Sequence, residues 1–237
     1  MDRLISRNID QIINNIGISA ARAGRRAREV KLMAVTKTVG DDQIREALES
    51  GITILGENYV QEALKKKPLF EGLAREVEMH MIGHLQTRKA AAAVRLFDMI
   101  HSLDRLELAR ELNKRSGAMG KVTKVLIEVN TGEEPTKGGV SPQEVFALIK
   151  AVSDMENLSV QGLMTIPPWF EDPEKARPYF ISLRKLKDEI EQMHFPRIKM
   201  EELSMGMTAD YLVAIEEGST MVRIGRGIFG ERPQKIK

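Results

Sequence analysis

Short apolar runs rich in β-branched residues alternate with longer amphipathic segments along this chain. Such alternation is typical of successive βα units around a parallel sheet. It predicts eight strands, over Lys31–Thr36, Ile52–Gly56, Glu78–Ile82, Met99–Ser102, Lys124–Asn130, Ser159–Thr165, Glu202–Met205 and Thr220–Ile224. Eight strands in 237 residues favour a closed (β/α)₈ barrel over an open doubly wound sheet, which usually has fewer. We therefore expect an α/β fold in which residues 1–237 form a single TIM-barrel domain.

An extra helix is expected before the first strand. Apolar residues at positions 4, 5, 9, 12, 13 and 16 give Arg3–Asn15 and its immediate surroundings an amphipathic pattern. Only GERPQKIK follows the turn after the eighth predicted strand, so the last helix of the barrel is short or absent. The N-terminal helix therefore either caps the barrel floor or replaces that final helix.

Composition and charge exclude several classes of protein. The 36 Lys and Arg nearly balance the 34 Asp and Glu, which argues against nucleic acid as a partner. The basic run Arg22–Arg28 is interpreted as a solvated connection, and its role is left open. The chain has no cysteine, no long apolar run and no leader pattern, so we expect no disulfide, no membrane partner and a cytoplasmic location. His80 and His84 straddle a strand and its turn without an HExxH pattern, and no metal site is predicted.

The segment Leu203–Gly230, LSMGMTADYLVAIEEGSTMVRIGRGIFG, carries the most specific signal. It places two glycine-containing turns after two short apolar strands, and backbone N–H groups at such turns bind phosphate. The candidate donors are Ser204, Gly206, Gly225 and the amide of Arg226. A literal G-x-G-x-x-G begins at Gly225, but only seven residues follow it, too few for a dinucleotide-binding unit.

Polar residues end otherwise apolar strands, where a barrel carries its chemistry. The strand-end positions singled out are Lys37, Glu57, Asn58, His84, Gln86, Asn130, Met164, Ser204 and Arg223. A lysine at an apolar strand end can be desolvated, which would lower its pKa and make its amine nucleophilic; the alternative is a strand-end lysine in solvent. Lys37 opposite a phosphate site is what pyridoxal phosphate (PLP) bound as a Schiff base requires. Glu57 and Glu62 are expected to cap and solvate the following helix.

The chain also resembles the YggS/PROSC family of pyridoxal phosphate homeostasis proteins over essentially its full length. The resemblance rests on AVTKT around Lys37, GENYVQE, IGHLQTRK, SLDR, VNTGEEPTKGG, GLMTI, LSMGMTAD and GSTMVRIGRGIFG. It implies an alanine racemase-like barrel without the second domain of that enzyme. Two departures are Arg88, where Asn is usual, and Thr208, where Ser is commoner; neither removes a proposed cofactor contact.

The resemblance also implies residue roles. Lys37 corresponds to the Schiff-base lysine, and Asn58 is a neighbour of the cofactor ring. Ser204 would hold the phosphate together with the amides of Gly225 and Arg226. Arg223 would lie beside the pyridine nitrogen.

Three functions are compatible with these residues. Arginine is always protonated, so Arg223 would leave the ring nitrogen unprotonated and the ring a poorer electron sink. We therefore favour a monomeric PLP carrier that buffers the cofactor or delivers it to apoenzymes, with little catalysis of its own. The second reading is an amino-acid racemase or other PLP enzyme, although Tyr59, Tyr179 and Tyr211 are expected to be structural or surface residues. The third is a phosphate-binding barrel enzyme without PLP.

Overall fold

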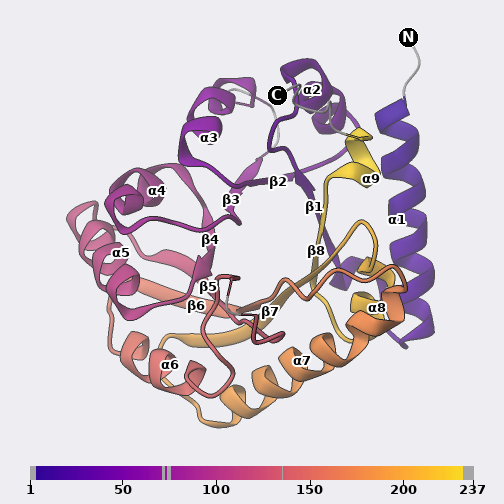
Figure 1. Cartoon of the computed structure of the whole chain (residues 1–237). Coiled ribbons are helices and arrows are strands. Elements are labelled where there is room, and N and C mark those ends of the chain that lie inside the picture. The colour runs from indigo at the N-terminus through magenta and orange to yellow at the C-terminus, as the bar shows by residue number, and fades with distance from the viewer. Residues whose placement is uncertain (1–3, 71–72, 74–75, 135, 232–237) are drawn as a thin grey trace.

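The computed structural model describes residues 4–70, 73, 76–134 and 136–231. Over these residues eight parallel strands pair in sequence order and close into a barrel surrounded by helices, as Figure 1 shows. The strands are β1 (Lys31–Val35), β2 (Ile54–Glu57), β3 (Glu78–Met81), β4 (Met99–Leu103), β5 (Thr123–Glu128), β6 (Leu158–Met164), β7 (Ile198–Met207) and β8 (Met221–Ile224). The predicted (β/α)₈ fold is confirmed, and the main difference is that β7 is ten residues long.

Helices follow the strands around the outside of the barrel. The α-helices are α1 (Leu4–Arg22), α2 (Asp41–Glu49), α3 (Val60–Lys66), α4 (Ala90–Leu96), α5 (Leu106–Ala118), α6 (Val145–Ser153), α7 (Arg177–Gln192), α8 (Tyr211–Glu216) and α9 (Arg226–Phe229). Short 3₁₀ helices are η1 (Ala27–Glu29), η2 (Lys67–Leu69), η3 (Thr87–Lys89) and η4 (Pro173–Ala176). Among the described helices, none combines the length and apolar character needed to cross a bilayer.

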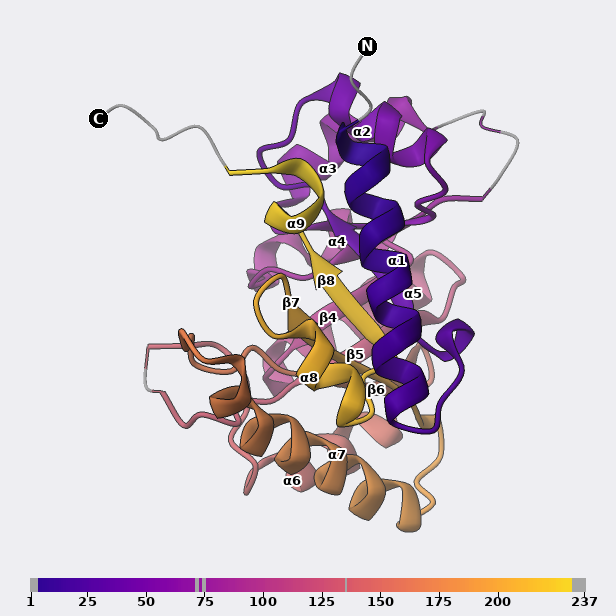
Figure 2. The ribbon, with the colours of Figure 1, turned by 90° about the vertical axis from the view of Figure 1, so that its right-hand side faces the viewer.

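Helix α1 replaces the final helix of the barrel and does not cap its floor. It lies along the outside of β8 and packs against α8, α9 and α2 (Figure 2). Its buried stripe, Ile5, Ile9, Ile12 and Ile16, belongs to one apolar cluster with residues of β8, α8 and α9. Burying each such side chain contributes roughly 1.5–3 kcal/mol. The four-residue α9 is too short to cover the barrel there, so α1 supplies the missing apolar face.

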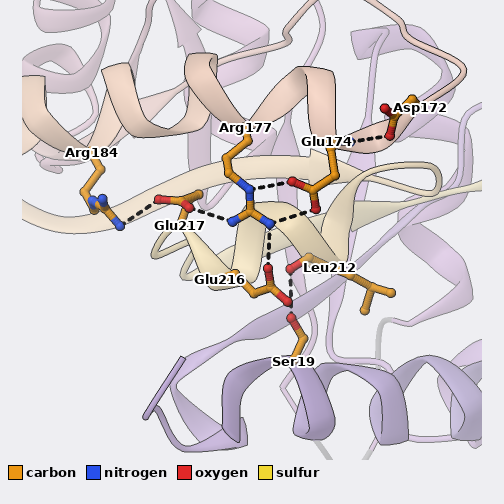
Figure 3. A network of polar contacts seen from close by, with 8 residues as sticks. All are labelled: Ser19, Asp172, Glu174, Arg177, Arg184, Leu212, Glu216 and Glu217. Atoms are coloured by element: carbon orange, nitrogen blue, oxygen red, sulfur yellow. Dashed lines mark hydrogen bonds and ion pairs between the residues drawn. The ribbon is translucent and has the colours of Figure 1, made fainter. Parts of the chain in front are cut away.

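A polar network fixes α8 in place between its neighbours. Arg177 of α7 donates to Glu216 at 2.7 Å and to Glu217 at 2.6 Å, at the end of α8 (Figure 3). On the other side, the hydroxyl of Ser19 in α1 donates to the carbonyl of Leu212 at 2.8 Å. Because α8 directly follows the turn after β7, these contacts also restrain that turn.

Part of the barrel interior is polar. His101 on β4 and Ser204 on β7 have no exposed surface, yet their side chains lie 3.0 Å apart. Strands β4 and β7 are not neighbours in the sheet, so this contact crosses the inside of the barrel. Buried polar groups without partners cost free energy, and these two satisfy each other.

Candidate functional site

A cavity of about 450 Å³ opens at the carboxyl ends of the strands. Residues following β1, β2, β3, β6, β7 and β8 meet around it, as expected for the functional end of such a barrel. Its lining is Val35, Lys37, Asn58, Ile82, Ile166, Pro168, Trp169, Met207, Thr208, Ala209, Asp210, Arg223, Gly225, Arg226 and Glu231. The structure thus brings together Lys37, Asn58, Arg223, Gly225 and Arg226, five of the eight site residues predicted from the sequence.

Helix α3 holds the backbone on both sides of Lys37. The carbonyl of Thr36 accepts a hydrogen bond from the Lys66 ammonium at 2.5 Å. The N–H of Thr38 donates to the Glu62 carboxylate at 3.1 Å, and Thr38 has a φ of 62°, which is uncommon for a residue other than glycine. The half-buried Lys37 therefore leaves β1 on a backbone whose direction is set by side chains of the next βα unit.

Glu57 does not cap α3, and that expectation is wrong. Its side chain is fully buried and accepts hydrogen bonds from Thr36 at 2.5 Å and from Lys66 at 2.6 Å. Burial raises the pKa of Glu57, while the hydrogen bonds from Lys66 and Thr36 oppose that rise. Because Glu57 is the last residue of β2, its side chain packs between the barrel and α3, where Lys66 at the end of α3 supplies the cation that it needs.

The wall beside Lys37 carries the turn after β8, which pairs with β1, and then the turn after β7. Gly225 and Arg226 begin α9, and the N–H of Gly227 donates to the hydroxyl of Thr208 at 3.2 Å. A threonine hydroxyl that accepts one hydrogen bond still has its own hydrogen to donate. This wall therefore presents a hydroxyl and backbone N–H groups beside the Arg226 side chain, a combination suited to an anion.

Arg223 forms the floor of the cavity. It is fully buried by the barrel, and its guanidinium donates to Ser204 at 2.7 Å and to the carbonyl of Thr165 at 2.8 Å. Burial lowers the pKa of Arg223 to about 10, and the carboxylates of Asp210 and Glu128 oppose that fall. Arg223 is therefore still a cation at neutral pH.

Asn58 contributes an unpaired polar atom to the wall. Its side-chain oxygen is buried and has no hydrogen-bond partner among the described residues. The backbone behind it is tightly packed, because a Cβ atom on Gly83 would lie 2.5 Å from the Asn58 carbonyl oxygen. Buried polar atoms are normally paired, so this amide indicates a position for a polar ligand atom.

Three predicted site residues, Ser204, Gly206 and Met164, do not line the cavity. The hydroxyl of Ser204 is occupied beneath it by Arg223 and His101. Met164 is fully buried in a small apolar cluster. Gly206 has a φ of 91°, and a Cβ atom there would lie 2.6 Å from Cβ of Ala214, so glycine allows β7 to pack against α8. These residues support the site from below or behind.

Thr208 is the cavity residue that sequence reasoning did not assign to the anion site. Strand β7 was predicted to end at Met205, which placed Ser204 at the barrel mouth. It continues to Met207, so the mouth lies at Thr208. The alternation of apolar Ile198 and Met200 with charged Lys199 and Glu201 is the sequence signal that indicates an earlier start of this strand.

Comparison with known proteins agrees with the fold and the sequence blocks. The model of the alanine racemase N-terminal domain matches residues 8–233. The chain belongs to that family. A pyridoxal phosphate homeostasis protein of Aquifex aeolicus is 45% identical over 224 residues, 94% of this chain and 96% of the relative. A protein of the same name from Escherichia coli is 38% identical, with 98% of this chain and 99% of the relative covered. The resemblance to the YggS/PROSC family is thereby confirmed.

Solved structures of the family have the same architecture. PipY of Synechococcus elongatus, solved with PLP bound, superposes with a TM-score of 0.83 at 32% identity and covers 95% of this chain and 100% of its own. An alanine racemase of Clostridium difficile has a TM-score of 0.70 at 16% identity. The match covers 98% of this chain but 58% of that enzyme, and at this identity it shows the fold alone.

Proposed function

We propose that this protein binds PLP covalently through Lys37 and takes part in PLP homeostasis by buffering the cofactor or delivering it. The observation that carries the proposal is that Lys37 and the anion-binding wall of Thr208, Gly225 and Arg226 line one cavity. PLP has an aldehyde at one side of its ring and a phosphate at another, so it needs an amine and an anion site together. The names of the relatives support the same cofactor.

The amine of Lys37 is suited to covalent capture. When bound, PLP supplies an aldehyde that reacts with primary amines and a pyridine ring that accepts electrons. Lys37 would hold the cofactor through its Nζ, because a primary amine condenses with an aldehyde and releases one water. The contacts from Lys66 and Glu62 restrain the backbone of Lys37, so less freedom is lost on reaction.

The phosphate role assigned to Ser204 passes to Thr208 in this proposal. The Thr208 hydroxyl donates its hydrogen to a phosphate oxygen, and the backbone amides of Gly225 and Arg226 donate alongside it. The Arg226 side chain adds positive charge at the rim of the cavity. Asn58 offers its unpaired side-chain oxygen to a donor group of the cofactor.

Arg223 favours carriage of the cofactor over turnover. With a pKa of about 10 it stays protonated at neutral pH, so it donates to the ring nitrogen and accepts no proton from it. The ring is then a weak electron sink. The described residues that line the cavity include no tyrosine that could face Lys37 as a racemase-type second base.

The proposal extends to the cellular role. The protein acts as a cytoplasmic monomer, made of one barrel domain, that hands PLP to apoenzymes that need it. The open cavity mouth supports exchange of the cofactor with the surroundings.

The deciding experiment is an absorbance titration of the purified protein with PLP, followed by borohydride reduction and peptide mass analysis. The wild type should give a visible imine band and a reduced adduct on Lys37. Lys37→Ala should lose both, whereas Lys65→Ala, which changes an exposed lysine of α3, should keep both. A wild type without the band would overturn the PLP proposal, and rapid turnover of alanine enantiomers would favour the racemase.

A further inference from the structure

A continuous chain of hydrogen-bonded side chains crosses the barrel from its floor to the cavity. Glu78, at the start of β3, contacts His80 Nε2 at 2.8 Å, and His80 Nδ1 lies 3.0 Å from His101 Nε2. His101 Nδ1 lies 3.0 Å from the Ser204 hydroxyl, which accepts from Arg223 at 2.7 Å. Both imidazole rings are fully buried, whereas Glu78 is partly exposed.

If both imidazole rings are neutral, only one donor-to-acceptor order gives every contact in this series one donor and one acceptor. A guanidinium only donates and an ionised carboxylate only accepts, which fixes the two ends. The hydrogen bond from His80 is the main cause that lowers the pKa of Glu78, so this carboxyl is the accepting end. The order is then Ser204 O–H to His101 Nδ1, His101 Nε2–H to His80 Nδ1, and His80 Nε2–H to Glu78.

The reverse order leaves contacts unsatisfied. If His101 Nδ1 carried the proton, the Ser204 oxygen would accept twice and its own hydrogen would need another partner. His80 Nε2 would then be an acceptor facing the Glu78 carboxylate, unless His80 carried a charge inside the barrel. Burial strongly lowers the pKa of His101, so this ring is neutral.

The forward order has a consequence at the cavity. Because the Ser204 hydrogen is directed to His101, the oxygen presents a lone pair to Arg223. A hydroxyl that turned its hydrogen toward the guanidinium would repel it. The lone pair of Ser204 and the carbonyl of Thr165 then hold two nitrogens of Arg223, which leaves the remaining N–H groups of the guanidinium for the cavity.

We propose that His101 is a positioning residue, which orients the Ser204 hydroxyl and through it the guanidinium of Arg223 at the cavity floor. His80 and Glu78 keep His101 in the tautomer that this requires. The effect on PLP rests on the proposed function, whereas the tautomer and the hydrogen-bond order belong to the protein without cofactor.

The first test is ¹⁵N NMR of the histidine side chains in cofactor-free protein at neutral pH. We expect an unprotonated Nδ1 and a protonated Nε2 for His101, with a coupling across the hydrogen bond to His80 Nδ1. A proton on His101 Nδ1, or a doubly protonated His80, would overturn the proposal. This measurement does not depend on whether PLP binds.

The second test is a double-mutant cycle read out by PLP affinity and by the absorbance maximum of the bound form. His101→Leu removes the acceptor for Ser204 and should weaken binding roughly tenfold and shift the maximum. His101→Asn places an amide oxygen close to the position of Nδ1 and should restore binding to within about threefold of the wild type. Ser204→Ala should match His101→Leu.

The double variant decides between positioning and simple packing. If His101 acts through Ser204, His101→Leu should have no further effect in the Ser204→Ala background. Additive losses, or equal losses for the Leu and Asn variants, would overturn the proposal. If His101→Leu does not fold, the comparison of His101→Asn with Ser204→Ala and the NMR measurement still decide it. A wild type that binds no PLP would refute the proposed function. The NMR result would then still test the order of the hydrogen bonds from Glu78 to Arg223.

Discussion

The ammonium of Lys66 lies 2.6 Å from the carboxylate of Glu57, and the two side chains form an almost wholly buried ion pair behind the strand end that carries Lys37. The same ammonium donates to the carbonyl of Thr36. One interaction thus joins the end of α3 to the ends of β1 and β2. The pair links the stability of the barrel to the placement of Lys37.

Loss of one partner of this pair should be costly. Lys66→Met leaves the Glu57 charge buried without its cation, and we expect a loss of about 3–5 kcal/mol in the free energy of unfolding. The double variant Glu57→Leu with Lys66→Met should recover most of that loss, because both charges are then removed. Urea denaturation measures both values. A double variant as unstable as the single one would show that the charge is not the cause.

Thr208 should control affinity for the phosphate. Thr208→Val keeps the shape of the side chain but removes the hydroxyl, and PLP affinity should fall roughly tenfold. Thr208→Ser keeps the hydroxyl that accepts from Gly227 and should bind nearly as the wild type does. Titration with PLP by absorbance or calorimetry checks this. Equal affinity of all three proteins would remove Thr208 from the anion site.

Gly206 should tolerate no side chain, for reasons of packing. Gly206→Ala combines a φ of 91° with a Cβ atom 2.6 Å from Ala214, and we expect a loss of more than about 2 kcal/mol in the free energy of unfolding. Gly24→Ala is the matched control, because its φ is 69° but no atom lies within 4 Å of the added carbon. Thermal denaturation should show a much smaller loss for the control. Similar losses would assign the effect to backbone conformation alone.

Glu128 should make the protein less stable as the pH rises through neutrality. Burial, with help from the charge of Asp104, raises the pKa of Glu128 from 4.5 to about 7. The folded protein therefore holds this proton more tightly than the unfolded chain does, so the cost is fully present above about pH 7 and fades toward pH 4.5. Glu128→Gln should be more stable than the wild type by up to about 3 kcal/mol at pH 8.

The two proteins should converge in acid. Urea denaturation at several pH values between 5 and 8 measures the difference, which should shrink steadily as the pH falls. A difference that does not change with pH would contradict the raised pKa of Glu128.

The order of the eight strands and the amphipathic N-terminal helix were predictable, because both follow from local apolar patterns. The limits of β7 were not, since Lys199, Glu201 and Glu202 interrupt its apolar run, although the alternation with Ile198 and Met200 marks a strand. A separate error at the other end, Met205 in place of Met207, moved the predicted barrel mouth from Thr208 down to Ser204. Boundaries matter more for the site than for the fold.

The partners of buried polar residues were beyond sequence reasoning. Ser204 and His101 are 103 positions apart, and no local pattern relates them. Glu57 resembles a helix-capping residue in the sequence, and only the barrel reveals that Lys66 reaches it. By contrast, Lys37, Asn58 and Arg223, which line the cavity, were singled out in the sequence because each stands at or near the end of an apolar strand.

The packing of α1 against β8 and α9 has a consequence for biosynthesis. Asn8 donates to the carbonyl of Ile228 at 2.9 Å across 220 positions of the chain. At ordinary rates of translation, the isoleucine stripe of α1 waits on the order of 10–40 s for the residues that cover it. During that interval the apolar face of α1 is exposed to chaperones and to other nascent chains. Gly225 and Arg226 are also among the last residues to be synthesised. The cavity that they line is therefore complete only when the barrel closes.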